Sequence, residues 1–180
     1  MSVDLPKPLI RGNTSARCLS DIMRPRSAEY EHMFHPGQEQ LGHYYLAPFQ
    51  RPPVWTDKQS ARLIESVHLG ISIGSFVVSG CGRHNPKTNL YPYTSEWIID
   101  GQQRMRALQK YMDDDLTVFV GSPHEHRWSQ LNRSQQRGFL MVPVGFIELT
   151  TDDEDELRDI YDRLNFGGVA HTDDQRAVKR

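Results

Sequence analysis

The chain has 180 residues, of which 37% are hydrophobic and 24% are charged, and its formal net charge is −2 at pH 7. A chain of this length can bury most of its apolar surface in one core without disulfides or structural metals. No apolar run approaches the roughly 20 residues that a membrane-spanning helix requires, so a membrane protein is not expected. The small net charge disfavours a protein that coats DNA through bulk electrostatics, although a local basic patch remains compatible with it.

The cysteines and the N-terminus indicate the compartment. Cys18 and Cys81 lack CxxC spacing and are too few for a disulfide framework, so we expect two free thiols. The segment from Met1 to Arg17 contains no apolar run that serves as a secretory signal. We therefore expect a cytoplasmic protein, located in the host cytoplasm if a phage encodes it.

The first residues predict a segment outside the main domain. Residues 1–27 are polar and contain Pro6, Pro8 and Pro25. This composition is typical of an arm that lies on the surface or stays mobile. We therefore predict an N-terminal arm over residues 1–27 and one nucleotide-binding domain over residues 28–180.

Aromatic residues, prolines and a helix cap punctuate the next segment. Residues 29–47 predict a short helix and a strand. The prolines of residues 47–55 exclude a helix and predict a rigid, extended loop. Thr56 predicts the N-cap of a helix that ends at Gly70. Residues 75–79 have the β-branched and aromatic composition of a strand.

Strands and helices alternate through the rest of the chain. A strand over residues 96–99 ends at Asp100-Gly101, and a helix follows from Gln102 to the acidic residues 113–115. This alternation predicts an α/β or α+β fold. The remaining predicted elements are a strand over 116–120, a helix over 131–140, a strand over 142–149, a helix capped by Thr151, and a last short helix capped by Thr172.

The strongest candidate site is Asp100-Gly101-Gln102-Gln103-Arg104, where a predicted strand turns into a predicted helix. Gly101 allows a close approach of the backbone to a ligand, and the N–H groups at a helix start attract anions. Arg104 is placed one turn into the helix, where it can contact a phosphate with two donors. Asp100 is suited to hold a divalent cation or to accept a hydroxyl proton in phosphoryl transfer. The pattern fits a surface turn equally well, with Asp100 capping the helix and the glutamines in solvent.

Two other motifs fit a ligand site but also fit ordinary structure. Gln50-Arg51 lies in the rigid loop, which lowers the entropy lost on binding, but pairing of Arg51 with an internal carboxylate is the simpler alternative. Trp55 fits the core better than a stacking platform. Arg163-Leu164-Asn165 ends a predicted helix, where Asn165 is a plain C-cap and a basic side chain is favourable.

Several other enzyme classes lack their motifs in this sequence. The segment Pro123-His124-Glu125-His126 does not have the HExxH spacing of zinc proteases, so we do not expect these histidines to bind a metal. No GxxxxGK[ST] motif and no nucleophile elbow occur, which disfavours P-loop proteins and α/β-hydrolases.

The motifs taken together resemble the N-terminal domain of GmrSD-type modification-dependent restriction systems, a family within the wider ParB/sulfiredoxin-like fold. The resemblance covers about residues 40–176 with its order preserved, and the DGQQR element is its strongest mark. It rests on Tyr45, Pro48-Phe49-Gln50-Arg51 with Trp55, Leu63-Ile64-Glu65-Ser66, Ile71-Ser72-Ile73-Gly74, Ile99 to Arg104, and Arg163-Leu164-Asn165.

The resemblance implies a small mixed sheet with surrounding helices and a function in nucleotide binding and hydrolysis beside a separate nuclease domain. The sequence ends at Arg180 without the HNH-type nuclease domain that usually follows, so we do not expect DNA cleavage by this chain itself. Stand-alone domains of this kind resemble phage kinases that phosphorylate 5-hydroxymethyluracil in DNA.

The predicted function is therefore an ATP-dependent (or other NTP-dependent), Mg²⁺-requiring transfer of phosphoryl to a modified base in DNA. The resemblance implies Asp100 as metal ligand or general base, and Arg104 and Arg51 as groups that stabilise phosphoryl charge. The alternative is an NTP-hydrolysing switch or modified-DNA sensor of a restriction or anti-restriction system that acts through a partner; a binding-only module is a third hypothesis, and a homo-oligomer is left open. The residues implied in nucleotide binding are Gln50, Gly101, Gln102, Gln103, Arg163 and Asn165.

Overall fold

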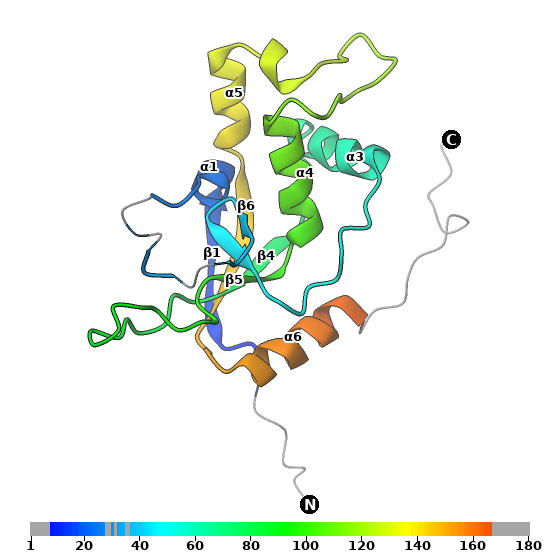
Figure 1. Ribbon diagram of the computed structural model, residues 1–180. Helices are drawn as coiled ribbons and strands as arrows, with labels where there is room; N and C mark the ends of the chain where they lie inside the picture. The colour runs from blue at the N-terminus through cyan, green and yellow to red at the C-terminus, as the bar shows by residue number, and fades with distance from the viewer. Residues whose placement is uncertain (1–7, 28–29, 31, 35–36, 167–180) are drawn as a thin grey trace, which may run out of the picture.

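The computed structural model describes residues 8–27, 30, 32–34 and 37–166, and its centre is a six-stranded mixed sheet with the order β1-β6-β4-β5-β3-β2 (Figure 1). The β1–β6, β4–β5 and β2–β3 pairs are antiparallel, whereas β4–β6 and β3–β5 are parallel. The predicted α+β class, with a small mixed sheet and surrounding helices, is confirmed. The strands are β1 (Gly12–Cys18), β2 (Gln40–Leu41), β3 (Tyr44–Leu46), β4 (Ser75–Ser79), β5 (Trp97–Asp100) and β6 (Pro143–Leu149).

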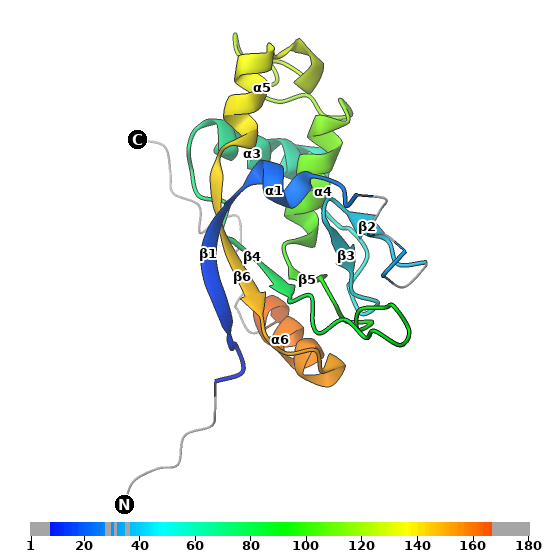
Figure 2. The same cartoon turned by 90° about the vertical axis from the view of Figure 1, so that its left-hand side faces the viewer.

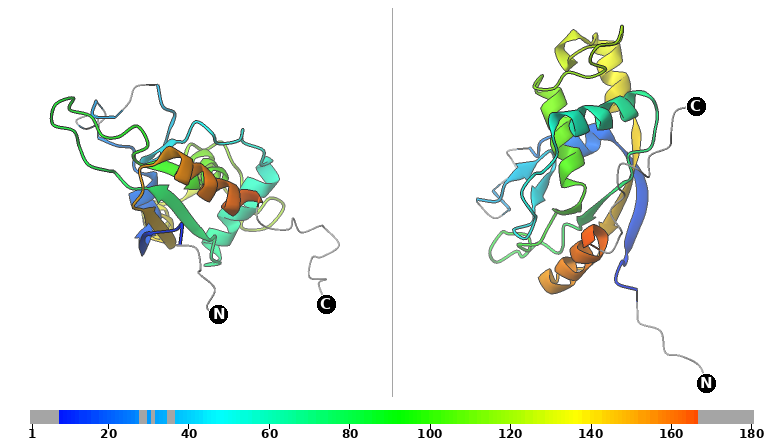
Figure 3. Two further views of the ribbon diagram at one scale, coloured as in Figure 1. Left: turned by 90° about the horizontal axis from the view of Figure 1, so that it is seen from below. Right: turned by 90° about the vertical axis from the view of Figure 1, so that its right-hand side faces the viewer.

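Helices cover both faces of this sheet. Helices α3 and α4 lie side by side on one face, and α6 crosses the other face (Figures 2 and 3). None of the helices in the described part of the chain is long and apolar enough to span a bilayer. The helices are α1 (Leu19–Met23), α3 (Asp57–His68), α4 (Gln102–Met112), α5 (Arg133–Leu140), α6 (Glu154–Phe166) and the short 3₁₀ helix η1 (Trp128–Gln130).

The two cores follow from the period-2 alternation of the central strands. In β5, Ile98 faces the core under α3 and α4, whereas Trp97 and Ile99 face the core under α6. In β4, Phe76 faces the core under α3 and α4, whereas Val77 faces the core under α6. The central strands are thus buried on both faces, which explains why they appear as continuous apolar runs in the sequence.

The prediction of a surface arm over residues 1–27 is wrong for the part that forms β1 and α1. All seven residues of β1 pair with β6, and Leu19 and Ile22 at the start of α1 are fully buried. The sequence concealed this strand because β1 is an edge strand with mostly exposed side chains, so it shows no apolar alternation. Residues 1–7 lie outside the described residues.

The elements around the candidate site were predicted correctly. The 47–55 segment contains no helix or strand, and Thr56 caps α3 through a reciprocal pair of hydrogen bonds with Gln59. The predicted strands and helices at β4, β5, α4, α5 and β6 are confirmed, with bounds that differ by one or two residues.

Two local predictions are wrong. Residues 116–120 form no strand but a single bridge between Val118 and His126. Helix α6 is capped not by Thr151 but by Asp153, whose side chain accepts hydrogen bonds from the N–H groups of Asp155 and Glu156. The predicted helix capped by Thr172 lies outside the described residues.

The turn from β5 into α4 depends on Gly101. Its φ of 113° lies in the left-handed region, which a residue with a side chain rarely adopts. A Cβ atom at this position would also lie 2.4 Å from Cδ1 of Phe76, which is fully buried in β4. Glycine is therefore required at position 101 for two reasons: the φ is positive, and the Phe76 ring leaves no room for a Cβ atom.

Replacing Ile22 with alanine tests whether α1 belongs to the core. Ile22→Ala removes a fully buried side chain, so we expect a loss of about 2–5 kcal/mol in the free energy of unfolding, measured by chemical denaturation. Ile10→Ala is the matched control, because Ile10 is 45% exposed, and it should change stability by less than about 0.5 kcal/mol. Equal effects of the two substitutions would contradict this packing.

Replacing Gly101 with alanine tests the turn. We expect Gly101→Ala to lose about 1–3 kcal/mol more stability than Gly121→Ala, because only the first substitution forces atoms into the core. Gly121 also has a positive φ of 77°, but a Cβ there meets no atom within 4 Å. Thermal or chemical denaturation of both variants measures the difference, and equal losses would show that Phe76 does not restrict position 101.

Candidate functional site

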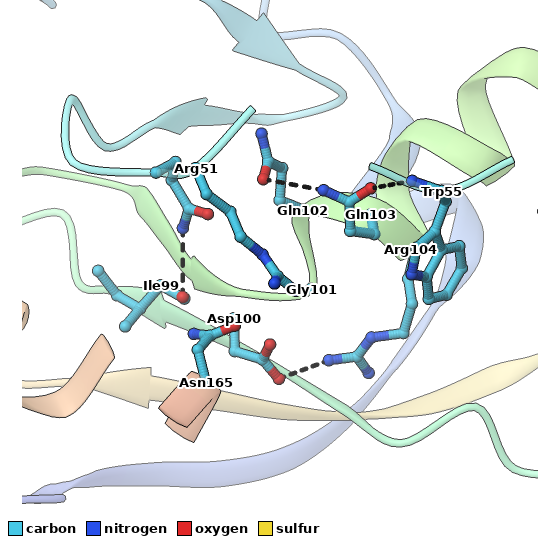
Figure 4. A pocket seen from close by; sticks show the side chains of 10 residues that line it. Arg51, Trp55, Ile99, Asp100, Gly101, Gln102, Gln103, Arg104 and Asn165 are labelled. Atoms are coloured by element: carbon cyan, nitrogen blue, oxygen red, sulfur yellow. Dashed lines mark hydrogen bonds and ion pairs between the residues drawn. The ribbon is translucent and has the colours of Figure 1, made fainter. Parts of the chain in front are cut away.

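A pocket of about 110 Å³ lies where β5 ends and α4 begins (Figure 4). Eight of the nine site residues predicted from the sequence line it. Arg163 is the exception: it is exposed and pairs with Asp159 on its own helix. The lining residues are Gln50, Arg51, Trp55, Ile99, Asp100, Gly101, Gln102, Gln103, Arg104 and Asn165.

The start of α4 forms one wall of the pocket. Gly101 is the N-cap and provides no side-chain cap, so the first N–H groups of the helix keep their capacity to donate. The first turn contains no acidic residue. The partial positive charge of the helix start is therefore not neutralised from within the first turn, which favours an anion in this pocket.

Asp100 does not cap the helix, contrary to the simpler alternative for this motif. Its Oδ2 instead accepts a hydrogen bond from Nη2 of Arg104 at 2.6 Å, in an ion pair one helical turn apart. Its other oxygen, Oδ1, forms no hydrogen bond or ion pair with any described residue. The carboxylate is thus oriented by the arginine and retains one oxygen for a ligand.

Arg104 has a larger structural role than the sequence suggested. Its guanidinium donates to the carbonyl oxygens of Ile73 at 2.9 Å and Ser75 at 3.0 Å, and it lies over the ring of Phe76. Burial lowers the pKa of Arg104 from its ordinary value, and the nearby Asp100 opposes this shift. Three of the five guanidinium N–H groups are used within the protein, so two remain for a ligand. Arg104 therefore holds the start of β4 and the residues just before it against α4, as well as lining the pocket.

The side chains of two glutamines form hydrogen bonds between the proline-rich loop and the β5–α4 junction. Gln50 donates from Nε2 to the carbonyl oxygens of Ile98 and Ile99 at 2.8 and 3.2 Å. Gln103 accepts with Oε1 from the backbone N–H groups of Val54 and Trp55 at 3.1 and 3.2 Å. Both ends of the loop are thus held, and Gln50, Arg51 and Trp55 of the loop line the pocket.

Arg51 is the cation that the loop presents to the pocket. Its backbone N–H donates to the Tyr161 hydroxyl, but its guanidinium forms no ion pair or hydrogen bond with any described residue. The simpler alternative, in which Arg51 pairs with an internal carboxylate, is therefore wrong for the described part of the chain. Figure 4 shows the Arg51 side chain extending toward the turn at Gly101.

Helix α6 closes the other side of the pocket. Asn165 lines the pocket and donates from Nδ2 to the carbonyl oxygen of Tyr161 at 2.9 Å, within the helix. It is a helical residue in α6 and not the predicted C-cap. Its amide oxygen faces a site built from three segments that are far apart in the sequence.

A second pocket of about 360 Å³ adjoins the first and shares Gln50, Arg51 and Gln102 with it. Sequence reasoning missed this pocket. Arg106 lines it one turn after Gln102 and pairs with Glu39, a residue from the segment before β2. The sequence contained one signal for Arg106: its i, i+4 spacing from Gln102 places the two side chains on the same face of α4. The residues that form the opposite wall of the pocket belong to no recognisable motif.

The described residues form no self-sufficient metal site, because no group of three or more carboxylate, histidine or cysteine side chains converges among them. The pocket nevertheless fits Mg²⁺ that arrives with a nucleotide. Mg²⁺ in such complexes uses one or two protein carboxylates and takes its other ligands from phosphates and water. The Oδ1 oxygen of Asp100 provides one carboxylate ligand of this kind.

Comparison with known proteins identifies the family. A family model described as GmrSD restriction endonuclease, N-terminal domain, matches residues 31–175, which include every lining residue of both pockets. Comparisons with curated proteins and with solved structures find no match. The matched segment begins after β1 and α1, so these two elements lie outside it. The chain belongs to the family of GmrSD restriction endonuclease N-terminal domains, which act on modified DNA as parts of restriction systems.

Proposed function

We propose that the pocket at the β5–α4 junction binds the phosphates of a Mg²⁺-bound nucleoside triphosphate and that the chain cleaves the γ-phosphoryl group in response to modified DNA. The observation that carries this proposal is the guanidinium of Arg51, which has no partner among the described residues and lies in the same pocket as the start of α4, where no side chain caps the helix. An unpaired cation beside free helix N–H groups is complementary to a phosphate and to no neutral ligand of similar size.

The volumes of the two pockets support a nucleotide. Pockets for whole ligands of this kind occupy about 300–1,000 Å³. The first pocket, at about 110 Å³, has room for phosphate groups only, while the adjoining pocket of about 360 Å³ has room for a nucleoside. Their shared residues, Gln50, Arg51 and Gln102, would then lie beside the bond between sugar and phosphate.

The helix N–H groups and the three charged side chains of the first pocket each have a defined role in this proposal. The first N–H groups of α4 bind phosphate oxygens, and Arg51 stabilises the charge that spreads over the transferred group. Asp100 holds the bound Mg²⁺ or receives the proton of the attacking hydroxyl. Arg104 orients Asp100 through their ion pair, and Mg²⁺ would supply further neutralisation of phosphate charge when bound.

Water is the acceptor that we propose, because a nucleotide-hydrolysing switch fits a domain of a restriction system. The transfer of phosphoryl to the hydroxyl of 5-hydroxymethyluracil, as predicted from the sequence, remains the alternative. A water molecule and a substrate hydroxyl occupy the same in-line position, so the residues of this pocket serve either reaction.

Incubation with γ-labelled ATP and GTP in the presence of thymine or 5-hydroxymethyluracil DNA distinguishes the two acceptors. We expect release of free phosphate, faster with the modified DNA. Label transferred to modified DNA would establish the kinase instead. No cleavage of any triphosphate with either DNA would refute the proposed activity.

The first prediction concerns Arg51. Arg51→Gln keeps a polar side chain but shortens it and removes its charge, so we expect kcat to fall by about 100-fold or more. Stability should stay within about 0.5 kcal/mol of the unsubstituted protein, because the guanidinium has no partner in the described part of the chain. Arg62→Gln, an exposed arginine on α3 that lines neither pocket, should leave kcat unchanged. Normal turnover in Arg51→Gln would remove Arg51 from the site.

The second prediction concerns Asp100. Asp100→Asn preserves an acceptor for Arg104 but removes the negative charge, so we expect kcat to fall by about 100-fold or more and Mg²⁺ dependence to weaken. The free energy of unfolding should fall by about 1–3 kcal/mol, because the buried guanidinium loses its counter-charge. Asp57→Asn, which removes a carboxylate that is 73% exposed, should change neither quantity noticeably. Steady-state kinetics and denaturation measure the two effects, and loss of stability alone would assign Asp100 a structural role.

A further inference from the structure

Strand β1 is a long and exposed edge of the central sheet. It is the outermost strand beside β6, and Figure 2 shows it along the rim of the sheet. Residues 12–16 are all exposed. The opposite edge of the sheet is β2, which has two residues, whereas β1 has seven. A very short edge strand offers little to another chain, but a long one presents a row of backbone donors and acceptors.

The hydrogen bonds at the two ends of β1 show which of its backbone groups point away from β6. Arg11 accepts a hydrogen bond from the residue after β6, and Leu19 donates one to the residue before β6. In an antiparallel ladder such residues alternate, so the odd-numbered residues of β1 bond to β6. The N–H and C=O groups of Gly12, Thr14 and Ala16 therefore point outward, and none of them bonds to another described residue.

Strand β1 also lacks the features that protect exposed edges. It contains no lysine and no proline, and its register with β6 is unbroken along its whole length. Arg17 is its charged residue, and this charge is paired with Glu148 of the same chain. The family model matches from residue 31 onward, so β1 lies outside the part of the chain that defines the family. An unprotected edge of this kind is suited to pairing with another strand.

We infer that two copies of this chain associate through β1, with the two strands antiparallel about a two-fold axis at Ser15. In this register Thr14 of one copy faces Ala16 of the other, and the two residues exchange two hydrogen bonds. The axis repeats this pair, so the outward groups of both residues are bonded in both copies. The two sheets then form one continuous sheet. This association goes beyond the proposed function and does not depend on nucleotide chemistry.

Charge selects this register over one centred on the preceding residue. With the axis at Ser15, Arg17 of one copy faces the neutral Asn13 of the other. An axis at Thr14 would instead place Arg17 opposite Arg11 of the other copy. Like charges that face each other across two strands are destabilising. The sequence of β1 therefore favours the axis at Ser15.

The ends of β1 favour the same register. An axis at Ala16 would place Gly12 opposite Ser20, which is in α1 and cannot extend the ladder. With the axis at the centre of β1, each strand overlaps the other over its full length. Ile10 of each copy, which is 45% exposed, then lies toward the end of the other copy's β1 at which Met141, 52% exposed, is found. The antiparallel arrangement thus gives exposed apolar side chains a partner at both ends.

The size of the contact determines its strength. One strand of seven residues from each copy forms it, whereas standard stable interfaces use about 20–30 residues from each partner. We therefore expect a dimer with a dissociation constant in the micromolar range rather than a permanent one.

Disulfide trapping tests the register directly. In a protein with Cys18→Ser and Cys81→Ser, the substitution Ser15→Cys places two thiols opposite each other. The Cα atoms of such a pair lie about 4.5 Å apart, within the range of a disulfide. Asn13→Cys is the matched control: it is exposed on the same face of β1, but the two copies of residue 13 are offset by about 14 Å along the strands. Under mild oxidation we expect covalent dimers of the first variant and not of the second.

Sedimentation velocity measures the association without a cross-link. We expect the dimer fraction of the unsubstituted chain to rise with protein concentration. Thr14→Pro removes an outward N–H without removing a bond to β6, and Ser15→Glu places two carboxylates opposite each other. Each should weaken the dissociation constant at least tenfold while the circular dichroism spectrum stays unchanged. Ser134→Glu, which adds the same charge at an exposed position on α5, should leave the dissociation constant unchanged.

Four results would overturn the inference. These are a monomer at every concentration, no cross-linking of Ser15→Cys, equal cross-linking of Asn13→Cys, and a dimer that Thr14→Pro and Ser15→Glu leave unaffected. Hydrogen exchange adds a further check, because outward amides of β1 that are protected at every protein concentration would be covered from within the same chain, which also overturns the inference. None of these measurements requires nucleotide or DNA, so their results are independent of the proposed function.

Discussion

The contact between the Gly101 backbone and the Phe76 ring is the constraint on which the phosphate pocket depends. It allows β5 to end and α4 to begin directly against the core, so the helix start reaches the pocket without an intervening loop. Arg104 reinforces this arrangement by binding the carbonyl oxygens of Ile73, just before β4, and of Ser75, the first residue of β4. Arg104 thereby links the start of β4 to Asp100 at the end of β5, and the ion pair orients the Asp100 carboxylate. The pocket is a consequence of core packing rather than an addition to its surface.

The sequence predicted the elements whose signals are local. Prolines defined the loop over residues 47–55, Thr56 defined the start of α3, and the glycine after β5 defined the start of α4. The sequence did not predict β1. This edge strand is held by its pairing with β6, and because most of its residues are exposed, it shows no apolar alternation. Nor did it predict that Arg104 binds carbonyl groups about 30 residues away in the sequence, since no motif marks a carbonyl acceptor.

The histidines at the far end of α3 and α4 illustrate the same limit. His124 and His126 are close in the chain, a spacing that raises the question of a metal site. Their structural partners instead come from α3 and α4, where His68 and Tyr111 showed no sign of a site. A hydrogen-bonded chain assembled from three segments leaves no spacing pattern, because each segment contributes a single residue to it.

Helices α3 and α4 are held together at both of their ends. At one end, Gln103 of α4 binds the backbone N–H of Trp55, immediately before the cap of α3. At the other end, Tyr111 of α4 hydrogen-bonds to His68 of α3, and Glu65 of α3 accepts from the N–H of Phe119 at 2.7 Å. A close-packed core resists continuous deformation, so packed helices keep their relative positions. The start of α4, which forms one wall of the phosphate pocket, is therefore positioned by contacts along the whole helix pair as well as by the turn at Gly101.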